Sequence, residues 1–464
     1  MKFLHFSDLH LGKRLNEFSL LEDQAYILEQ IIKIVDEERP DAVLIAGDVY
    51  DKAVPSAEAV ALFDRFLTQL ARRPGKVFVS SGNHDSAERI AFGASIMGRS
   101  GVYVSPVYEG HVEPVTVSDR QGMEAAVYML PFVKPATVRP FFPEREIASY
   151  TDAVRAAVEE MMGRNAAERS DTEQGGAGQD GAEQVGVGQA SCCGVGKNFT
   201  GPRILLSHQF VTGALRSDSE EVSVGGVDNV DVSVFAPFNY VALGHLHAAQ
   251  EIAIPRQEQT GGGQKEQFVE RRQEQIGDGK QAPPAPQDAS GEVSVSHGIA
   301  RYCGAPLKYS FGEAGQEKSA TIVEFAAGAG GSSASCTAPH IRTRPLRPLR
   351  DLLNVCGTYL EVTARDFYNG FDRNAYLHVT LTDEEDVPDA ARKLALIYPN
   401  LMKLDYDNVR TRTHQEVDGA QEPERQDPLA LFAAFYEKQN NQPMSAEQEK
   451  DVRALIGKVW DENS

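Results

Sequence analysis

The sequence predicts a layered α/β domain over residues 1–325, followed by a smaller α/β module. Short runs of apolar and β-branched residues alternate with longer segments that carry apolar residues at helical spacing. That alternation is typical of buried strands packed between helices. Polar residues able to bind metal follow directly after the strand-like runs.

Five strand-like runs and two helices define this predicted domain. The strand-like runs cover residues 3–6, 42–45, 77–79, 204–206 and 240–243. Apolar residues recur at helical spacing over residues 20–35, and Pro40 separates this helix from the next strand-like run. A second helix is predicted over residues 56–72, with Phe63 and Phe66 on its apolar side. Strand, helix and strand therefore follow one another from the N-terminus.

Three stretches of low complexity interrupt the pattern. Residues 165–200 are rich in Gly, Gln, Ala and Ser, residues 256–297 add Pro and charge, and residues 326–339 are mostly Gly, Ala and Ser. Segments of such composition bury too little apolar area to offset the entropy of ordering. We interpret them as mobile surface insertions; a role as interaction arms is the alternative.

The rest of the chain divides into a linker, a small module, a second linker and a C-terminal segment. Residues 326–356 are predicted to be a linker, and residues 357–410 a module with strand-like runs at 359–362, 376–381 and 401–404 and a helix at 390–397. A polar linker follows at 411–427. Residues 428–464 carry two amphipathic helices, the second of which starts with the capping-box pair Ser445 and Gln448. These helices either pack on their own domain or dock into a groove of a partner.

Composition favours a reducing compartment and gives no sign of a membrane segment. His5 and Asp8 interrupt the apolar start of the chain, unlike a signal peptide, and no 18 apolar residues follow one another. The five cysteines are odd in number and lack CxxC spacing, which argues against a disulfide framework and against a cysteine metal site. We therefore expect a soluble cytoplasmic protein.

The net charge of −21 argues against a nucleic-acid enzyme that works alone, because Lys and Arg supply most of the affinity for phosphates. Basic residues are clustered at Lys13 and Arg14, and again at Arg342, Arg344, Arg347 and Arg350. The second cluster is either a solvated linker or a DNA contact. Bound cations and a basic partner could offset the acidity, so the charge favours a subunit over a self-sufficient nuclease.

Short polar motifs after the strand-like runs carry the chemistry. In chain order they are Asp8-x-His10, Gly47-Asp48, Gly82-Asn83-His84-Asp85, Ser207-His208 and Gly244-His245-x-His247. Ligands gather at the carboxyl ends of strands in open α/β sheets. Carboxylate and imidazole together suit manganese, iron or zinc, whereas magnesium and calcium prefer oxygen alone. Two such cations, about 3.5–4 Å apart, can clamp the attacking and leaving oxygens in phosphodiester hydrolysis.

Spacing within the motifs gives a geometric expectation. Residues two apart on an extended chain point to the same side, so one cation could take both Asp8 and His10, and the same holds for His245 and His247. One such motif alone is weak evidence, but the whole ordered set argues against a purely structural interpretation. The other histidines lack this context and are interpreted as structural or solvated; they are His5, His111, His297, His340, His378 and His414.

At these motifs the chain resembles the calcineurin-like metallophosphoesterases, and within them the nuclease subunits of bacterial SbcC–SbcD complexes. The stretches that carry the resemblance read FSDLHLG from Phe6, AGDVYD from Ala46 and SGNHDS from Ser81. A later stretch, GAPLKYSF from Gly304, and the tail from Asp427 match as well. The resemblance covers nearly the whole chain apart from the three insertions.

The resemblance implies a role for almost every motif residue. One cation would be held by Asp8, His10, Asp48 and His247, and the other by Asp48, Asn83, His208 and His245. Asp48 would bridge the two cations. His84 would not be a ligand; it would steady the phosphate or protonate the leaving 3′ oxygen. Archaeal and eukaryotic relatives carry a histidine where this chain, like the bacterial branch, has Asp51.

The resemblance also implies a fold, an activity and partners. The fold would be a β-sandwich flanked by helices, with residues 357–410 as a capping domain beside the metals and residues 428–464 docked on an SbcC-like coiled-coil ATPase. The activity would be manganese-dependent 3′–5′ exonuclease action on double-stranded DNA, and endonuclease action on single strands and hairpins, in DNA recombination, replication and double-strand break repair. The family works as a homodimer within a heterotetramer.

Two other functions compete with this one. A small-molecule phosphodiesterase or phosphomonoesterase explains the ligands and the acidity, but leaves the module at 357–410 and the tail without a purpose. The second is a non-catalytic scaffold for the ATPase, and the intact ligand set argues against it. The chain has no GxxxxGK[ST] motif, so the ATPase must be another chain.

Overall fold

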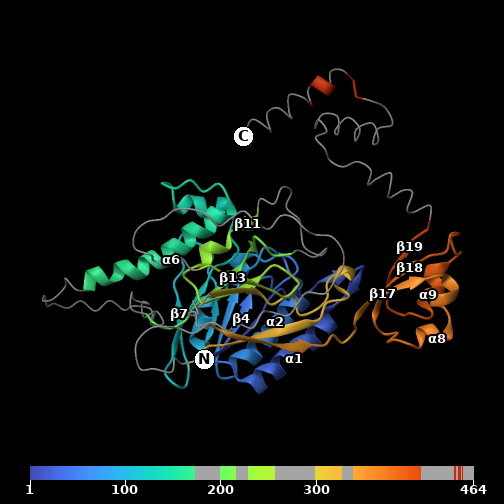
Figure 1. The fold of residues 1–464 in the computed structure, drawn as a ribbon, viewed down its shortest axis with the longest axis horizontal. Helices are drawn as coiled ribbons and strands as arrows, with labels where there is room; N and C mark the ends of the chain where they lie inside the picture. The colour runs from blue at the N-terminus through green and yellow to red at the C-terminus, as the bar shows by residue number, and fades with distance from the viewer. Residues whose placement is uncertain are drawn as a thin grey trace, which may run out of the picture. The chain divides into compact units, whose positions relative to one another are not determined.

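The computed structural model describes residues 1–172, 199–215, 228–255, 298–326 and 338–408, with residues 444–445, 448–450 and 452 near the C-terminus. Most of the predicted insertions, the linker at 411–427, nearly all of the C-terminal segment at 428–464, and His297 and His414 lie outside these residues. The chain divides into two compact units (Figure 1). The first comprises Met1–Asn354 and Asn374–His378, and the second Val355–Arg373 and Val379–Ser464.

Two six-stranded sheets form the first unit. The first sheet runs in the order β16 (His340–Leu346), β15 (Lys318–Glu324), β1 (Lys2–Phe6), β4 (Ala42–Ala46), β5 (Lys76–Ser80) and β6 (Val102–Val104). The second runs in the order β13 (Gln250–Ile254), β14 (Gly298–Tyr302), β12 (Tyr240–Gly244), β9 (Arg203–His208), β8 (Glu124–Met129) and β7 (Val115–Ser118). Two short pairs stand apart, β2 (Arg14–Leu15) with β3 (Phe18–Ser19), and β10 (Phe210–Val211) with β11 (Asn229–Val230).

Four neighbouring strands are parallel in each sheet. They are β1, β4, β5 and β6 in the first sheet, and β14, β12, β9 and β8 in the second. The remaining strands of both sheets pair antiparallel at the edges. All five strand-like runs predicted from the sequence lie in these parallel strands. The predicted layered α/β fold with a β-sandwich is confirmed.

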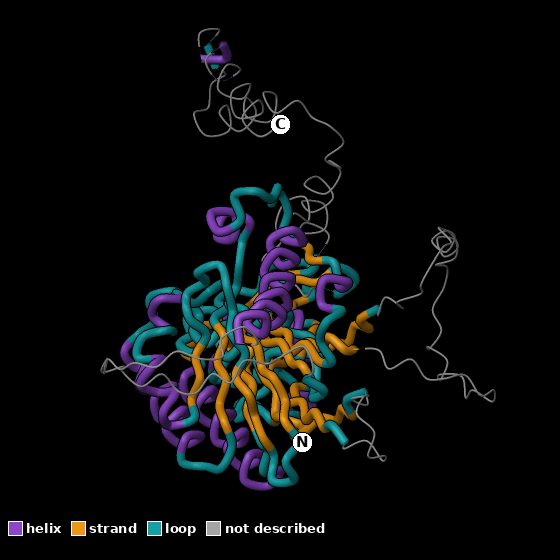
Figure 2. The backbone as a smooth tube through the Cα atoms, turned by 90° about the vertical axis from the view of Figure 1, so that its left-hand side faces the viewer, coloured by secondary structure: helices purple, strands orange, loops and turns teal. Residues whose placement is uncertain are grey.

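Apolar side chains from both sheets fill the space between them. The core contains Phe3, Leu44 and Phe78 from the first sheet and Val127, Leu206 and Tyr240 from the second, all fully buried. Every residue of β4 and of β12 is buried, so both faces of these strands are covered. Strands covered on both faces need continuous apolar runs, which is why the sequence shows no alternation there. Figure 2 shows the strands gathered in the centre with helices outside them.

Three long helices cover the outer faces of the sandwich. The two helices predicted from the sequence are α1 (Leu21–Glu38) and α2 (Ala57–Ala71), which pack against each other (Figure 1). The Ser56 hydroxyl caps α2 by accepting the Ala59 N–H at 3.3 Å. The third is α6 (Tyr150–Thr172), which buries Val154 and Val158 in the core beside the second sheet. Residues 165–172, assigned to an insertion from the sequence, continue this helix.

Short helical turns complete the first unit. They are α3 (Ala87–Ile90), α4 (Ala94–Met97), η1 (Gly98–Ser100), α5 (Pro135–Val138), η2 (Arg139–Phe141), η3 (Val232–Phe235) and η4 (Phe311–Glu313). Among the helices that the structure describes, none is long and apolar enough to cross a lipid bilayer.

Strand β16 corrects the prediction of a linker at residues 326–356. It pairs with β15 along its whole length and forms the edge of the first sheet. Arg342 and Arg344 of β16 both form ion pairs with Glu38, at the end of α1. Arg350 forms ion pairs with Glu22 and, at 2.8 Å, with Asp23. These three arginines therefore hold the edge strand and the following segment to α1, which corrects the interpretation as a solvated linker.

Glu38 is the centre of this ion-pair cluster, and we expect its replacement to weaken the fold. Its carboxylate accepts hydrogen bonds from Lys2, Arg342 and Arg344, and its side chain is 9% exposed. The hydrogen bond from Arg342 holds the pKa of Glu38 well below its usual range, although partial burial opposes this. Glu38→Gln should lower the free energy of unfolding at pH 7 by about 1–2 kcal/mol, measured by denaturant titration.

The difference in the free energy of unfolding between wild type and Glu38→Gln should depend on pH in a defined direction. Because the pKa of Glu38 is lower in the folded chain, its stabilisation is complete above the unfolded pKa of about 4.3 and is lost as pH falls toward the folded value. The difference should thus be constant from about pH 7 to pH 5 and shrink below that. Glu37→Gln, at a side chain 59% exposed, is the matched control and should cost less. Equal costs for both variants would refute the central role of Glu38.

The module after residue 350 contains a three-stranded sheet. Its order is β17 (Leu352–Gly357), β18 (Tyr376–Leu381) and β19 (Leu401–Tyr406). The helices are α7 (Tyr359–Val362), α8 (Arg365–Tyr368) and α9 (Ala390–Ala395). The predicted strands at 376–381 and 401–404 and the helix at 390–397 are confirmed, with the helix ending two residues earlier.

The predicted strand at residues 359–362 is wrong, since these residues form helix α7. Thr358 and Glu361 make a capping box, in which Glu361 N donates to the Thr358 hydroxyl and Thr358 N donates to Glu361 Oε2 at 2.8 Å. These local bonds outweigh the β-propensity of Tyr359 and Val362. The capping box predicted further along is confirmed: Ser445 N donates to Gln448 Oε1 at 2.9 Å, and Gln448 N to the Ser445 hydroxyl at 3.3 Å.

Candidate metal centre

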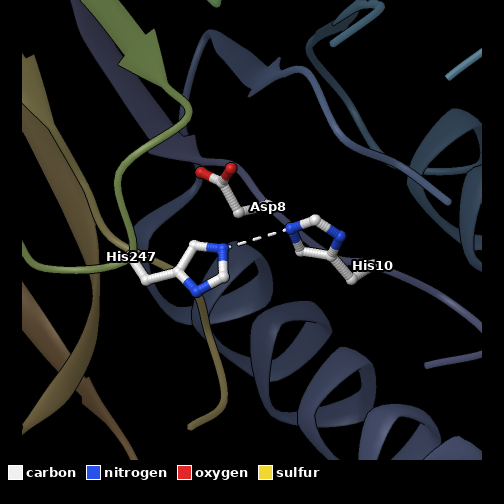
Figure 3. Close-up of side chains that lie close together, drawn as sticks. All are labelled: Asp8, His10 and His247. Atoms are coloured by element: carbon white, nitrogen blue, oxygen red, sulfur yellow. Dashed lines mark hydrogen bonds between the residues drawn. The ribbon is translucent and has the colours of Figure 1, made fainter. Parts of the chain in front are cut away.

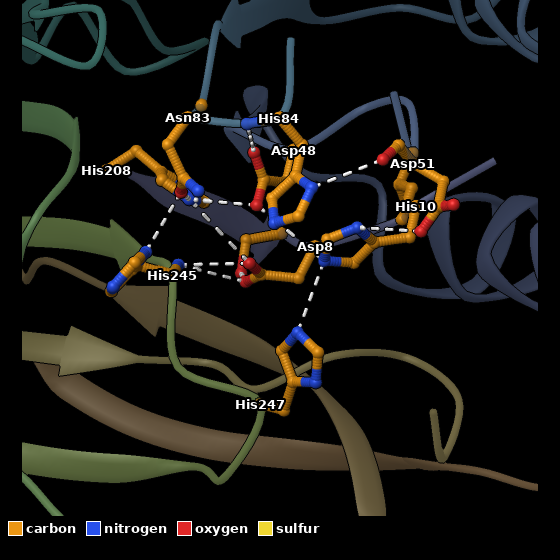
Figure 4. A network of polar contacts seen from close by, with 12 residues as sticks. Asp8, His10, Asp48, Asp51, Asn83, His84, His208, His245 and His247 are labelled. Carbon is orange, nitrogen blue, oxygen red and sulfur yellow. Dashed lines mark hydrogen bonds and ion pairs between the residues drawn. The ribbon is translucent and has the colours of Figure 1, made fainter. Parts of the chain in front are cut away.

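The polar motifs of the sequence meet at the carboxyl ends of parallel strands from both sheets. Asp8 and His10 follow β1, Asp48 follows β4, Asn83 and His84 follow β5, His208 ends β9, and His245 and His247 follow β12. Figure 4 shows these eight side chains in one cluster. The sequence therefore located every member of the cluster, and the fold brings all of them together.

Four of these residues have a backbone conformation that residues other than glycine rarely adopt. The φ angle is 54° at Asp8, 43° at His10, 48° at Asp48 and 100° at His245. Strain of this kind persists only where the surroundings impose it, and it gathers at functional sites. The expectation of an extended chain through Asp8 and His10 is wrong, because β1 ends at Phe6 and a left-handed loop carries both residues.

The first group in the cluster consists of Asp8, His10 and His247, whose ligand atoms lie within 4.8 Å of one another. Nε2 of His10 lies 3.2 Å from Nε2 of His247. Figure 3 shows the two rings facing each other through these nitrogens, with the Asp8 carboxylate beside them. The same His10 atom lies 3.6 Å from Asp48 Oδ2. The exposed fraction of these four residues is at most 4%.

The second group consists of Asn83, His208 and His245. Asn83 Oδ1 lies 3.1 Å from His208 Nε2 and 3.0 Å from His245 Nδ1. His208 Nε2 also lies 3.2 Å from Asp48 Oδ2, so this single oxygen stands between the two groups. His245 and His247 point into different groups, which corrects the expectation that both face one cation.

The distances and the chemistry of these atoms fit divalent cations. Ligand atoms about 2.1 Å from a cation, at angles of about 90–109°, lie about 3.0–3.4 Å from each other. His10 and His247 place two Nε2 atoms 3.2 Å apart, where two neutral imidazoles can share only one proton. Nδ1 of His10 is buried and has no hydrogen-bond partner among the described residues. Carboxylates, imidazoles and an amide oxygen together suit manganese, iron or zinc.

Hydrogen bonds behind two of the imidazoles turn their Nε2 atoms toward the cluster. Nδ1 of His208 donates to the Ala46 carbonyl at 2.9 Å. Nδ1 of His247 lies 3.1 Å from Glu313 Oε1. A histidine that donates through one nitrogen presents the other as a lone pair, which is the arrangement found in metal-binding histidines.

Electrostatics in the cluster are strongly coupled. Burial raises the pKa of Asp8 to about 6, against the opposing charges of His208 and His247. Burial would raise the pKa of Asp48. The charge and hydrogen bond of His208 and the charge of His10 have the larger effect together, and they hold the pKa of Asp48 well below its usual range. Burial lowers the pKa of His10, whereas for His208 the Asp48 carboxylate outweighs burial and raises the pKa to about 9.

His84 lies beside the first group with a different orientation. Its backbone N–H donates to Asp48 Oδ1 at 2.9 Å, and its ring Nδ1 lies 3.2 Å from the Asp51 carbonyl. The His84 ring packs edge-on against His10, with centroids 4.9 Å apart. Asp51 itself pairs with Lys13 at 2.8 Å. One ligand atom each from His84, His10 and Asp48 lies within 4.8 Å of the other two. The geometry is therefore compatible both with His84 as a metal ligand and with a role outside the ligand set.

Three charged residues around the cluster were missed by sequence reasoning. The Asp85 carboxylate accepts backbone N–H groups of Val49, Tyr50 and Gly82 at 2.9–3.0 Å, and so ties the loop after β4 to the loop after β5. Its place in the GNHD motif could have revealed it. Glu313 and Lys318 form a buried ion pair behind His247. Their only sequence signal is their position after the GAPLKYSF stretch.

Gly47 illustrates how tightly the loop after β4 is packed. Its φ is +83°, and an added Cβ would lie 2.2 Å from Nδ1 of His208. Gly122 has the same conformation, φ +84°, but an added Cβ there meets nothing within 4 Å. We expect Gly122→Ala to lower the free energy of unfolding by about 1 kcal/mol through backbone strain. Gly47→Ala should lower it by a further 1–3 kcal/mol, about as much as overpacking costs, and should also weaken Mn²⁺ binding. Denaturant unfolding and Mn²⁺ titration of both variants test this, and equal losses would contradict it.

Comparisons with known proteins agree with this site. Residues 1–122 match the calcineurin-like phosphoesterase family. Residues 343–440 match a family described as the type 5 capsule protein repressor C-terminal domain. The whole chain is similar to the SbcD subunit of the nuclease SbcCD from Staphylococcus epidermidis, with 26% identity over 99% of both chains.

A solved structure gives a weaker likeness. It is a dimetal phosphatase from Danio rerio, 9% identical, with a TM-score of 0.35 over 74% of this chain and 96% of that one. The match over residues 1–122 coincides with the half of the cluster that lies on β1, β4 and β5. By its motifs and the match over residues 1–122, the chain contains a calcineurin-like phosphoesterase domain, and a domain of this family implies divalent metal ions.

Proposed function

We propose that this chain is the nuclease subunit of an SbcCD-like complex and hydrolyses DNA with two divalent cations, most readily Mn²⁺, with Fe²⁺ or Zn²⁺ as alternatives. The observation that carries the proposal is the convergence of two ligand groups on one shared oxygen, Asp48 Oδ2. The similarity over 99% of an SbcCD subunit supports DNA as the substrate rather than a small ester. We assign 3′–5′ exonuclease action on double-stranded DNA and endonuclease action on single strands and hairpins, in recombination, replication and double-strand break repair.

The assignment of ligands follows the two groups. Asp8, His10, Asp48 and His247 would hold one cation, and Asp48, Asn83, His208 and His245 the other. When bound, such cations polarise the phosphate and supply hydroxide near neutral pH. The protein contributes the fixed geometry: strained loops and hydrogen bonds hold the side chains before any substrate arrives.

His84 is assigned to the leaving group. With Nδ1 donating to the Asp51 carbonyl, its Nε2 is the atom available to a substrate. A protonated His84 would donate from Nε2 to the leaving 3′ oxygen, and in either protonation state the ring would position the phosphate. Its backbone bond to Asp48 does not depend on the ring.

The acidic chain needs help to hold DNA. Near the cluster, exposed Lys134 lies 5.8 Å from the Phe132 ring, which packs 6.4 Å from the His208 ring. Such local charges do little against a net charge of −21, so we propose that an SbcC-like coiled-coil ATPase supplies most of the DNA-binding surface. Residues 428–464 would dock on that partner and residues 357–410 would cap the metal site. The working unit would be a homodimer within a cytoplasmic heterotetramer.

The test is Mn²⁺-dependent cleavage of a hairpin-ended DNA duplex, beside the generic ester bis-p-nitrophenyl phosphate. Both assays are run with and without the ATPase and ATP, and Asp48→Ala serves as the blank. DNA cleavage that ATP stimulates and that the blank lacks is the expected result. Turnover of the small ester alone, with DNA intact in the presence of the ATPase, would instead identify a small-molecule phosphodiesterase. No turnover of either, with the ATPase bound, would identify a scaffold.

A further inference from the structure

We propose that Glu313 is a positioning residue for His247, braced by Lys318, and that this buried pair sets the affinity of one of the two cation sites. The inference rests on the proposed function of the cluster. Glu313 belongs to η4, and Lys318 starts β15. Their side chains are 0% and 4% exposed and meet at 2.6 Å.

Every polar atom of the pair has a partner. Lys318 Nζ donates to Glu313 Oε2 at 2.6 Å, to Gln316 Oε1 at 2.8 Å and to the His247 carbonyl at 2.9 Å, which uses all three of its protons. Glu313 Oε1 faces His247 Nδ1 at 3.1 Å. The pair thus holds His247 at two points, the back of its ring and its main-chain carbonyl.

A buried ion pair of this kind needs a reason other than stability. Removing two charges from water is unfavourable, and apolar residues in the same place often leave a protein as stable or more stable. Here the pair secures the orientation of one side chain. With Nδ1–H directed to Glu313, the Nε2 lone pair of His247 points at His10 Nε2, as the dashed contact in Figure 4 shows.

The two groups of the cluster differ in this support. His208, in the second group, is oriented by the backbone carbonyl of Ala46, which no side-chain substitution removes. His247, in the first group, depends on a charged side chain, which also makes its imidazole a stronger ligand. Loss of Glu313 should therefore weaken only the cation beside His10 and His247.

The test compares wild type, Glu313→Gln and the charge-free double variant Glu313→Leu with Lys318→Met, which leaves no buried lysine unpaired. Glu251→Gln is the matched control, because it breaks an ion pair with Arg301 away from the cluster. The first readout is the tautomer of His247 in the metal-free chain, from ¹H–¹⁵N spectra of ¹⁵N-histidine protein. The second is Mn²⁺ binding, from the signal of free Mn²⁺ in electron paramagnetic resonance.

The expected result has two parts. In wild type and Glu251→Gln, His247 carries its proton on Nδ1 and the chain binds two Mn²⁺. In the double variant that tautomer is no longer dominant, and in both Glu313 variants one Mn²⁺ binds about 10–100-fold more weakly while the other is unchanged. An unchanged tautomer in the double variant, or equal weakening of both cations, would overturn the proposal. If wild type bound two Mn²⁺ tightly but did not cleave DNA, that result would count against the proposed function and not against this inference.

Discussion

Asp48→Asn should abolish both cation binding and catalysis while leaving the fold intact. Its Oδ2 atom lies 3.6 Å from His10 Nε2 and 3.2 Å from His208 Nε2, so one change removes a charged ligand from both groups. The amide keeps the shape of the carboxylate but carries no charge to hold a cation. Loss of several kcal/mol of transition-state stabilisation lowers the rate by about 10³-fold or more. The measurements are DNA cleavage with Mn²⁺ and the number of Mn²⁺ ions bound.

Asp41→Asn is the control for this variant. Asp41 directly precedes the opposite end of the same strand, β4. Its carboxylate accepts the Lys2 backbone N–H at 2.7 Å, a bond that an asparagine oxygen retains. The control should bind two cations and cleave DNA at the wild-type rate. If Asp48→Asn still bound two cations with wild-type affinity, Asp48 could not be the shared ligand.

His84→Ala should have the opposite signature, with both cations retained and the rate lost. The bond from His84 to Asp48 comes from the backbone N–H, so removal of the ring leaves Asp48 in place. What disappears is the imidazole that packs beside His10 and donates through Nδ1 to the Asp51 carbonyl, with Nε2 left for the substrate. Loss of a general acid lowers kcat by about 10²–10⁴-fold. Single-turnover cleavage at saturating Mn²⁺, together with Mn²⁺ titration, separates the two effects.

A half-buried histidine outside the cluster provides the control for this change. His111→Ala removes an imidazole whose contact is the Glu109 carbonyl, and it should change neither the rate nor the metal content. If His84→Ala lost one Mn²⁺ together with its rate, His84 would be a ligand. The structure is compatible with that outcome, because ligand atoms of His84, His10 and Asp48 lie within 4.8 Å of one another.

The strand ends and the cluster could be predicted because both are encoded locally. Asp48 and His208 directly follow or end short apolar runs that are buried on both faces, so the sequence itself places them at strand ends. Their grouping could not be predicted from spacing. His245 and His247 separate because the loop after β12 takes φ 100° at His245, a conformation that only the folded surroundings impose.

Other differences have equally specific causes. The composition of residues 359–362 predicts a strand, but the side chains of Thr358 and Glu361 cap a helical turn there. Arg342 and Arg344 read as a linker because their partner, Glu38, is about 300 residues away in the chain. Glu313 and Lys318 are charged residues whose burial only the fold reveals. In each case the structure depends on a specific contact between side chains, and neither composition nor periodicity reveals such a contact.

The most direct test of the two-cation centre is anomalous diffraction from crystals of the whole chain grown with Mn²⁺. The account predicts two peaks, about 3.5–4 Å apart, on either side of Asp48. One should be bound by Asp8, His10 and His247, and the other by Asn83, His208 and His245. A single peak, no peak, or a peak coordinated by His84 in place of these ligands would contradict it.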